Sequence, residues 1–198
     1  MVLEWRWYTW GMGEAAKKLP APITLEEWIA LEQETDERHE LVDGELWAMS
    51  GSSTPHNKIV RNIEKTLLSA EELGCRIHVI DIKVWAEDKG YYPDVILACE
   101  GEEDLYLEPY PCLLVEVLSP STAYKDYNQK KQAYFTLPTL KQYMIVSVER
   151  RYVEVFTRGL LGWHFAEYSL ESDTIALECV DLKIPLEGIY RNVRGLNA

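Results

Sequence analysis

The sequence has few basic residues for its acidity, since 20 Lys and Arg stand against 33 Asp and Glu, a formal net charge of −13. This deficit argues against charge-driven binding of nucleic acid over a wide surface, which needs basic side chains to displace counterions from phosphates. A local basic strip, or a site where bound metal ions reverse the sign of the field, stays open. The chain also lacks an apolar run of 18 residues, so we expect no membrane span.

Paired CxxC motifs and the Cys/His spacing of zinc sites are absent as well. The four cysteines are Cys75, Cys99, Cys112 and Cys179. We interpret them as reduced thiols of a cytoplasmic protein. The first residues lack the continuous apolar core of a signal peptide, which agrees with that location.

The length of 198 residues suits one domain with a small extension. We predict an N-terminal arm at 1–22, a single domain at 23–191 and a tail at 192–198. The arm contains Trp5, Trp7 and Trp10. These rings either pack on a partner or belong to a poorly ordered start.

The local patterns predict a mixed α/β domain with a central sheet flanked by helices and extra antiparallel strands toward the C-terminus. Thr24 and Glu27 form a capping-box pattern for a helix that ends near Glu34. Asp43-Gly44 is typical of a tight turn between two short strands. Further helices are expected at 55–72 and 123–137, and strands at 75–86, 94–99, 112–119, 143–148, 152–157, 163–169 and 174–178. The segment EGEEDLYLEPYP, 100–111, reads as an acidic, solvated loop.

Two carboxylates face each other if the strands at 94–99 and 112–119 are antiparallel neighbours. Pairing Ala98 with Cys112 places Asp94 opposite Glu116, with Cβ atoms roughly 5 Å apart. Such a pair repels unless a proton or a cation lies between the two groups. Mg²⁺ is the cation that suits an all-oxygen site. The alternative is that each acid faces solvent at a strand end.

The helix at 123–137 carries a lysine on its apolar face. The residues of this face are Ala123, Tyr127, Lys130, Tyr134 and Leu137, with spacings of 4, 3, 4 and 3. An inward lysine needs a carboxylate partner or a path to solvent. Lys130 could reach Asp94 and Glu116, or it could form a structural pair with Asp126, four residues earlier. Two carboxylates, a metal and a lysine together fit phosphodiester hydrolysis.

Three segments resemble the large bacterial Uma-type family of proposed restriction endonucleases, within the PD-(D/E)XK nuclease superfamily. They are ITLEEWIALEQETDERHELVDGELWAMSG, YYPDVILA and CLLVEVLSPSTAYKDYNQKKQAY, and the resemblance runs from about Ile23 to Tyr190. It implies a restriction-endonuclease-like fold, with Asp94, Glu116 and the carbonyl of Val117 as Mg²⁺ ligands, Mn²⁺ being a possible substitute. It also implies a DNA endonuclease, for which a two-fold homodimer would suit cleavage of both strands.

One departure from the superfamily pattern affects the catalytic lysine. Leu118 stands where the pattern has lysine, two residues after Glu116, so Lys130 would have to supply the ammonium from the helix. If Lys130 only pairs with Asp126, the site could be inactive. The chain would then be a binding module of nuclease descent. Another alternative is an enzyme acting on a smaller phosphodiester or a nucleotide.

Several supporting candidates remain. His56 begins a helix stripe with Val60, Ile63 and Leu67, and is either a structural histidine or a phosphate contact or general base. Of Glu40 and Glu45, which flank the turn in ELVDGEL, we choose Glu40 as the one that approaches the metal. Asp81 either lines the same cleft or is exposed. Lys125, Lys130 and Lys131 are either a solvated face or a contact to DNA.

Overall fold

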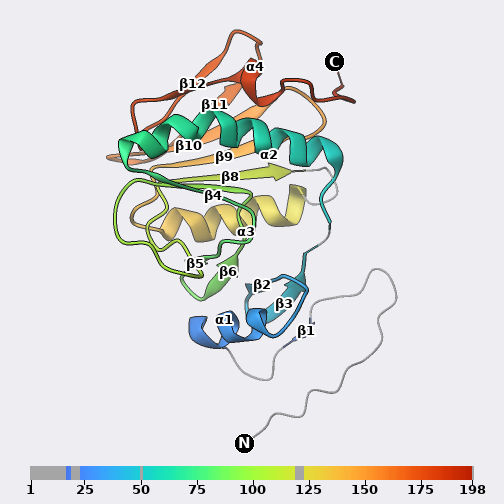
Figure 1. Ribbon diagram of the computed structural model, residues 1–198, viewed down its shortest axis with the longest axis vertical. Coiled ribbons are helices and arrows are strands. Elements are labelled where there is room, and N and C mark those ends of the chain that lie inside the picture. Colours follow the sequence, from blue (N-terminus) through green and yellow to red (C-terminus); the bar gives the residue numbers. More distant parts are fainter. Residues whose placement is uncertain (1–16, 19–22, 50, 119–122, 198) are drawn as a thin grey trace, which may run out of the picture.

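A computed structural model gives the structure of residues 17–18, 23–49, 51–118 and 123–197 (Figure 1), with side chains described for all of these except 17, 18 and 123–126. Most of the predicted arm, including Trp5, Trp7 and Trp10, lies outside the described residues, as does the segment 119–122. Within the described part, no helix is long and apolar enough to cross a membrane.

The centre of the fold is a six-stranded mixed sheet with the order β11-β10-β9-β8-β7-β4. Its strands are β4 (Arg76–Val79), β7 (Val95–Ala98), β8 (Leu113–Leu118), β9 (Gln142–Ser147), β10 (Val153–Gly159) and β11 (Gly162–Tyr168). Only β8 and β9 pair in parallel; the other neighbours in this sheet are antiparallel. A parallel pair needs a long crossover connection, and helix α3 (Ala123–Thr136) supplies it.

Helices α2 (Thr54–Leu67) and α3 cover opposite faces of this sheet (Figure 1). Ser53 caps α2 by accepting a hydrogen bond from the His56 amide, and Pro55 stands in the first turn. A 3-10 helix at Leu68–Leu73 continues α2 and ends at Gly74, whose φ of 83° is left-handed. The helix predicted at 55–72 is therefore confirmed as two consecutive helical segments.

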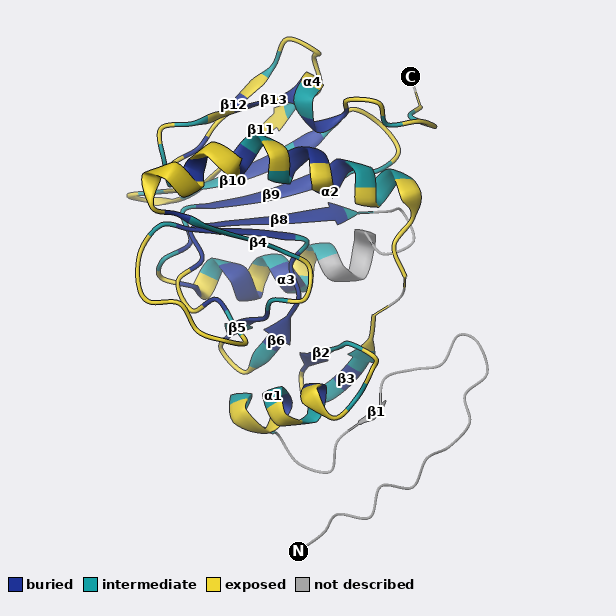
Figure 2. Ribbon diagram, viewed as in Figure 1, coloured by how far each residue is buried: buried dark blue, intermediate teal, exposed yellow. Residues whose placement is uncertain are grey.

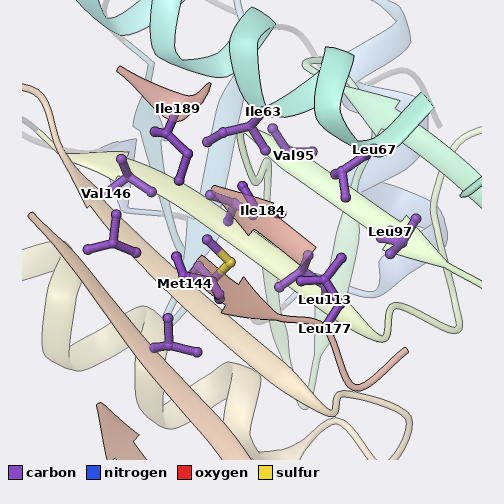
Figure 3. Close-up of a cluster of buried hydrophobic side chains, with 14 of the residues drawn as sticks. Ile63, Leu67, Val95, Leu97, Leu113, Met144, Val146, Leu177, Ile184 and Ile189 are labelled. Carbon is purple, nitrogen blue, oxygen red and sulfur yellow. The ribbon is translucent and has the colours of Figure 1, made fainter. Parts of the chain in front are cut away.

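The core on the α2 side is a cluster of buried hydrophobic side chains (Figure 3). It joins Ile63 and Leu67 of α2 to side chains of β7, β8 and β9, and to the C-terminal elements β12 (Thr174–Ala176), β13 (Lys183–Pro185) and α4 (Leu186–Ile189). Figure 2 shows the central strands in the buried colour, while the outward face of α2 is exposed. The antiparallel pair β12 and β13 confirms the extra C-terminal strands; β13 was not predicted.

The core on the α3 side is built from the alternate residues of the same strands. Ile96 of β7 and Leu114 of β8 belong to this core with Tyr134 of α3 and with Leu137, the residue after the helix. Side chains in a strand alternate between faces, so residue Glu116 of β8 belongs to this side too. The two-faced burial explains why these strands read as continuous apolar runs in the sequence.

A second, five-stranded sheet carries the N-terminal part of the chain, with the order β1-β3-β2-β6-β5. Its strands are β1 (Lys17–Lys18), β2 (His39–Val42), β3 (Glu45–Ala48), β5 (Val84–Ala86) and β6 (Lys89–Tyr91). Helix α1 (Leu25–Gln33) begins at the predicted capping box and places the fully buried Trp28 on this sheet. Gly90 lets the Trp28 ring approach, because a Cβ there would lie 2.4 Å from it. The predicted turn at Asp43-Gly44 joins β2 to β3.

The single strand predicted at 75–86 is wrong. The chain divides it into β4 and β5, which belong to different sheets. Ile80 and Asp81 cause the division, since both have left-handed φ angles, 62° and 67°. The apolar residues change phase here, from Ile77 and Val79 to Ile80, Ile82 and Val84, and this shift was a signal of the break that the prediction passed over. The short β6 was likewise not predicted.

The interpretation of the cysteines as reduced thiols is also wrong. They form two disulfides, Cys75–Cys99 and Cys112–Cys179. Cys75 and Cys99 become cross-strand neighbours because β4 pairs with β7 in the register Arg76↔Ala98. Cys179 reaches Cys112 because the chain after β12 returns to the central sheet. The spacing of the cysteines along the sequence indicated neither of these two pairings.

Candidate active site

Glu116 lies inside the protein, with 3% of its surface exposed. The register of β7 with β8 pairs Val95 with Val115 and Leu97 with Leu113. Continued by one residue, it places Asp94 opposite Glu116, as the sequence predicted. Asp94 is further fixed to β8, because its Oδ2 accepts a hydrogen bond of 2.8 Å from the Val117 amide.

Lys130 points from α3 into this buried region, as its place on the apolar face predicted. Its Nζ lies 3.2 Å from both carboxylate oxygens of Glu116 and 2.7 Å from Oε1 of Glu40. Tyr134, one turn later, donates a hydrogen bond of 2.8 Å to Glu116. The side chain of Asp126 lies outside the described residues, so the described partners of Lys130 are these two glutamates.

Glu40 reaches the site from the N-terminal sheet. It stands on β2, and its Oε1 also accepts a hydrogen bond of 3.5 Å from the Tyr92 amide. The turn after β2 is tied to α3 through Gln129, which donates to Asp43 at 3.1 Å. The structure thus brings Glu40 to Lys130; Glu45, on β3, makes no such contact in the part of the chain described. The choice of Glu40 over Glu45 agrees with this placement.

His56 contacts Asp94 from the other side of the sheet. Its Nε2 lies 3.2 Å from each Asp94 carboxylate oxygen. Burial is the largest single effect and lowers the pKa of His56, but the hydrogen bond to Asp94, the charges of Asp94 and Glu116 and the Asn57 side chain together outweigh it and raise the pKa. The other ring nitrogen, Nδ1, is buried with no hydrogen-bond partner among the described residues.

The charges of the site do not balance. Three carboxyl groups lie here: Glu116 and Glu40 share one ammonium, Lys130, while Asp94 contacts His56. Burial raises the pKa of Glu116, and the carboxylates of Asp94 and Glu40 raise it further, against the lowering by Lys130. Burial alone would lower the pKa of Lys130, but Glu116 and Glu40 hold it well above its ordinary value. A site with excess negative charge favours a further proton or a bound cation.

Other candidate residues are not brought to this group. Asp81 is exposed, lies 3.4 Å from Arg38 Nε, and lines a separate hollow with Lys83, which agrees with the second of its two alternatives, an exposed residue. Lys131 lies over the ring of Tyr127, 4.3 Å from its centroid. The side chain of Lys125 lies outside the described residues.

Sequence reasoning missed Tyr91. Its ring is buried and lies 5.8 Å from Lys130 Nζ, so it forms part of the wall around the ammonium. It also packs edge-on against Tyr134, with centroids 5.3 Å apart. Its position in YYPD, three residues before Asp94, is the feature of the sequence that could have identified it as a site residue. Leu118, at the position of the motif lysine, is half-buried and packs against the α3-side core.

Asp94 and Glu116 are the side chains of this site that could bind a metal ion. In the described residues, no group of three or more His, Cys, Asp and Glu side chains is arranged to hold a metal ion. Asp94 and Glu116 instead offer two neighbouring carboxylates. That fits Mg²⁺, which is bound through one or two carboxylates with waters and substrate phosphate completing the shell.

Comparison with protein families gives a match that covers most of the chain. The family model "Uma2: Putative restriction endonuclease" matches residues 25–187. Two curated relatives from Synechocystis sp. (strain ATCC 27184 / PCC 6803 / Kazusa) are both described as uncharacterized proteins. The relative slr1290 is 31% identical over 177 residues, which are 86% of this chain and 93% of the relative. The relative sll1609 is 33% identical over 131 residues, 63% and 74% of the two chains.

A solved structure shares the fold. It is the crystal structure described as "a putative nuclease belonging to DUF820 from Anabaena variabilis ATCC 29413". The TM-score is 0.68 at 16% sequence identity, and the match covers 85% of this chain and 98% of that chain. The predicted fold class, a restriction-endonuclease-like mixed sheet flanked by helices, is confirmed.

Proposed function

The chain belongs to the Uma2 family, and from that premise we propose that it is a Mg²⁺-dependent endonuclease hydrolysing phosphodiester bonds in DNA. The observation that carries the proposal is the buried carboxylate Glu116, held between Lys130 and Tyr134 and placed beside Asp94. A core carboxylate with one ammonium and two acidic neighbours is costly for a purely structural role. It suits a site that takes up a cation.

In this proposal Asp94, Glu116 and the carbonyl of Val117 hold Mg²⁺, or Mn²⁺ as a substitute. The ion would lower the pKa of a bound water and stabilise charge on the phosphate. The chain's own residues hold the carboxylates in place for that task. The Val117 amide and His56 fix Asp94, while Tyr134 and Lys130 fix Glu116.

Lys130 has the second role in the proposal. Its ammonium takes the place of the motif lysine, which is Leu118 here, and neutralises charge that develops on the phosphate oxygens. Glu40, which contacts Lys130 at 2.7 Å, keeps that ammonium charged and oriented. We further propose that the protein acts as a homodimer, because two sites related by a two-fold axis can cut both strands of a duplex.

The test is nicking of a supercoiled plasmid by purified protein with Mg²⁺ or Mn²⁺. We expect the wild type to nick and Glu116→Gln to lose nicking, because the amide removes the negative charge that a metal ligand needs. Glu72→Gln, an exposed glutamate in the 3-10 helix, is the matched control and should keep nicking. Nicking that survives in Glu116→Gln would contradict the assignment and indicate a contaminating nuclease.

A second candidate function is an inactive nuclease-fold binding module. It is favoured by Leu118, which packs in the core where the motif has its lysine, and by the net charge of −13. Metal binding separates the two functions. For the nuclease, Mg²⁺ at 100 times its Kd should stabilise the wild type by about 2.7 kcal/mol, since it binds only the folded state. Thermal unfolding with and without Mg²⁺ measures this, and Glu116→Gln should show no shift. An unshifted wild type at saturating Mg²⁺ would favour the binding module.

A further inference from the structure

The four cysteines meet at one end of the central sheet. Cys75 directly precedes β4, Cys99 follows β7, Cys112 precedes β8, and Cys179 lies after β12. The two disulfides touch each other, because the Sγ atom of Cys112 lies 3.9 Å from that of Cys99. Asp94 and Glu116 stand toward the opposite ends of β7 and β8, so this cluster is separate from the candidate active site.

We propose that this cluster is a site of thiol–disulfide exchange, which takes two electrons from a small dithiol and shifts its remaining disulfide to Cys99–Cys112. The proposal does not depend on the nuclease function. It depends on three properties of the cluster: the contact between the disulfides, the anchoring of the backbone at each cysteine, and the different exposure of the sulfurs.

Backbone hydrogen bonds hold the cysteines in place independently of the disulfides. The Cys75 amide donates to Ala70 O at 3.0 Å, and the Cys112 amide donates to Leu97 O at 2.8 Å. The Cys112 carbonyl accepts from Lys141 and Gln142 at 2.9 and 3.0 Å.

The other two cysteines are held through their neighbours. Arg76 donates to the carbonyls of Glu100 and Gly101, the two residues after Cys99. The buried side chain of Gln142 accepts from the amide of Glu178, next to Cys179, at 2.8 Å. Opening one disulfide therefore leaves the sulfurs of Cys99 and Cys112 close together.

The exposure of the sulfurs determines which cysteine of each disulfide an incoming thiolate attacks. Each disulfide joins one buried cysteine, Cys75 or Cys112, to one half-buried cysteine, Cys99 or Cys179. A thiolate from solvent thus reaches Cys99 or Cys179 before the buried cysteine of the same pair. The exchange begins at Cys179, because this attack releases Cys112, whose sulfur lies 3.9 Å from that of Cys99 in the other disulfide. Attack on the Cys179 sulfur breaks the Cys112–Cys179 bond, and the electron pair leaves on Cys112.

The Cys112 thiolate is then formed beside the second disulfide. Its attack on Cys99 forms the Cys99–Cys112 bond and breaks Cys75–Cys99, and the released Cys75 thiolate takes a proton. The second thiol of the dithiol closes a ring and releases Cys179, which also takes a proton. In total the dithiol loses two electrons and two protons, and the protein gains one thiol at Cys75 and one at Cys179.

The exchange changes which part of the chain is cross-linked. The Cys112–Cys179 disulfide ties the segment after β12 to the central sheet, and its two cysteines are 67 residues apart in sequence. The Cys99–Cys112 disulfide would instead close the loop 100–111 and join the adjacent strands β7 and β8. The C-terminal segment would lose its covalent tie to the central sheet, while the strands β7 and β8 would gain a cross-link at the end opposite to Asp94 and Glu116.

The test is partial reduction of the full-length protein with dithiothreitol, followed by acid quenching, alkylation with N-ethylmaleimide and peptide mapping by mass spectrometry. We expect a two-electron-reduced species with Cys75 and Cys179 alkylated and a peptide that links Cys99 to Cys112. Partly reduced species in which only Cys75 with Cys99, or only Cys112 with Cys179, are alkylated would overturn the proposal. Four free thiols under oxidised dithiothreitol, or one bound zinc per chain, would overturn it too.

A double variant tests the Cys99–Cys112 pairing directly. Cys75→Ser/Cys179→Ser leaves Cys99 and Cys112, which we expect to oxidise in a glutathione redox buffer. The same variant unfolded in urea is the control. The equilibrium constant for forming the Cys99–Cys112 disulfide should be at least ten-fold larger in the folded form, because the fold holds the two sulfurs close together. Equal oxidation of both forms, or two free thiols in the folded form, would contradict the proposal.

Discussion

Replacing Lys130 with methionine is expected to lower the free energy of unfolding by about 3–5 kcal/mol, the cost of removing one partner from a buried ion pair. The ammonium contacts Glu116 at 3.2 Å and Glu40 at 2.7 Å, and the residue is 7% exposed. Methionine has a similar length, so the main change is the lost positive charge. Glu116 and Glu40 would then lose their shared counter-charge, while Asp94 keeps its contact with His56.

Urea unfolding of the metal-free protein at pH 7 measures this loss. Lys65→Met is the matched control, because Lys65 is an exposed lysine on another helix, and we expect a change within about 0.5 kcal/mol. The double variant Lys130→Met/Glu116→Gln should recover part of the loss, since it also removes the buried carboxyl group that Lys130 contacts. Equal stability of Lys130→Met and the wild type would show that the lysine does not balance these carboxylates.

The pair Asp94 and Glu116 could be predicted because strands β7 and β8 are adjacent along the chain and regular. One assumed pairing, Ala98 with Cys112, fixes all others in an antiparallel ladder, and the structure follows that register through Val95↔Val115. Lys130 was predictable for a similar reason. It shares a helical face with Tyr134 and Leu137, both buried, so its direction follows from helical periodicity.

The positions of Glu40 and Tyr91 in the site could not be predicted from local periodicity. Glu40 contacts Lys130, 90 residues later in the sequence, and the contact exists only because the N-terminal sheet lies against α3. Tyr91 belongs to the short strand β6, which carries no clear alternating pattern. Such contacts between separate sheets are set by tertiary packing, which a period of 2 or 3.6 residues does not encode.

The loop 100–111 differs from its prediction at Glu108. Its composition predicts a solvated acidic loop, and Glu102 and Glu103 are indeed exposed. Glu108, however, is 1% exposed. Its partners come from β4, a strand more than 25 residues earlier, so charge counting within the loop could not identify it as buried.

Glu108 is held by a dense set of donors. Arg76 binds both carboxylate oxygens, Nε to Oε2 and Nη2 to Oε1, each at 3.0 Å. His78 Nε2 lies 3.0 Å from Oε2, and the Tyr110 amide donates to Oε1 at 2.9 Å. Burial alone would raise the pKa of Glu108, but the hydrogen bonds from His78, Arg76 and Tyr110 outweigh it and lower the pKa to about 2.

This lowered pKa makes stability depend on pH in the acid range. The pKa falls from the ordinary value of 4.5 to about 2 on folding, so the unfolded chain binds more protons between these values. The contribution of Glu108 is therefore complete above about pH 4.5 and is lost as the pH falls toward 2. A shift of this size corresponds to roughly 3 kcal/mol.

Glu108→Gln is accordingly expected to lower the free energy of unfolding at pH 7 by roughly 3 kcal/mol. Its stability should also fall less steeply than that of the wild type between pH 4.5 and 3, because the titrating group is gone. Urea unfolding across this range measures both effects, with Glu102→Gln, an exposed glutamate of the same loop, as the control. If Glu108→Gln and the wild type lose stability in parallel on acidification, the ion pairs of Glu108 are not the origin of the acid sensitivity. The free-energy difference at pH 7 would then reflect only the loss of hydrogen bonds to Arg76 and His78.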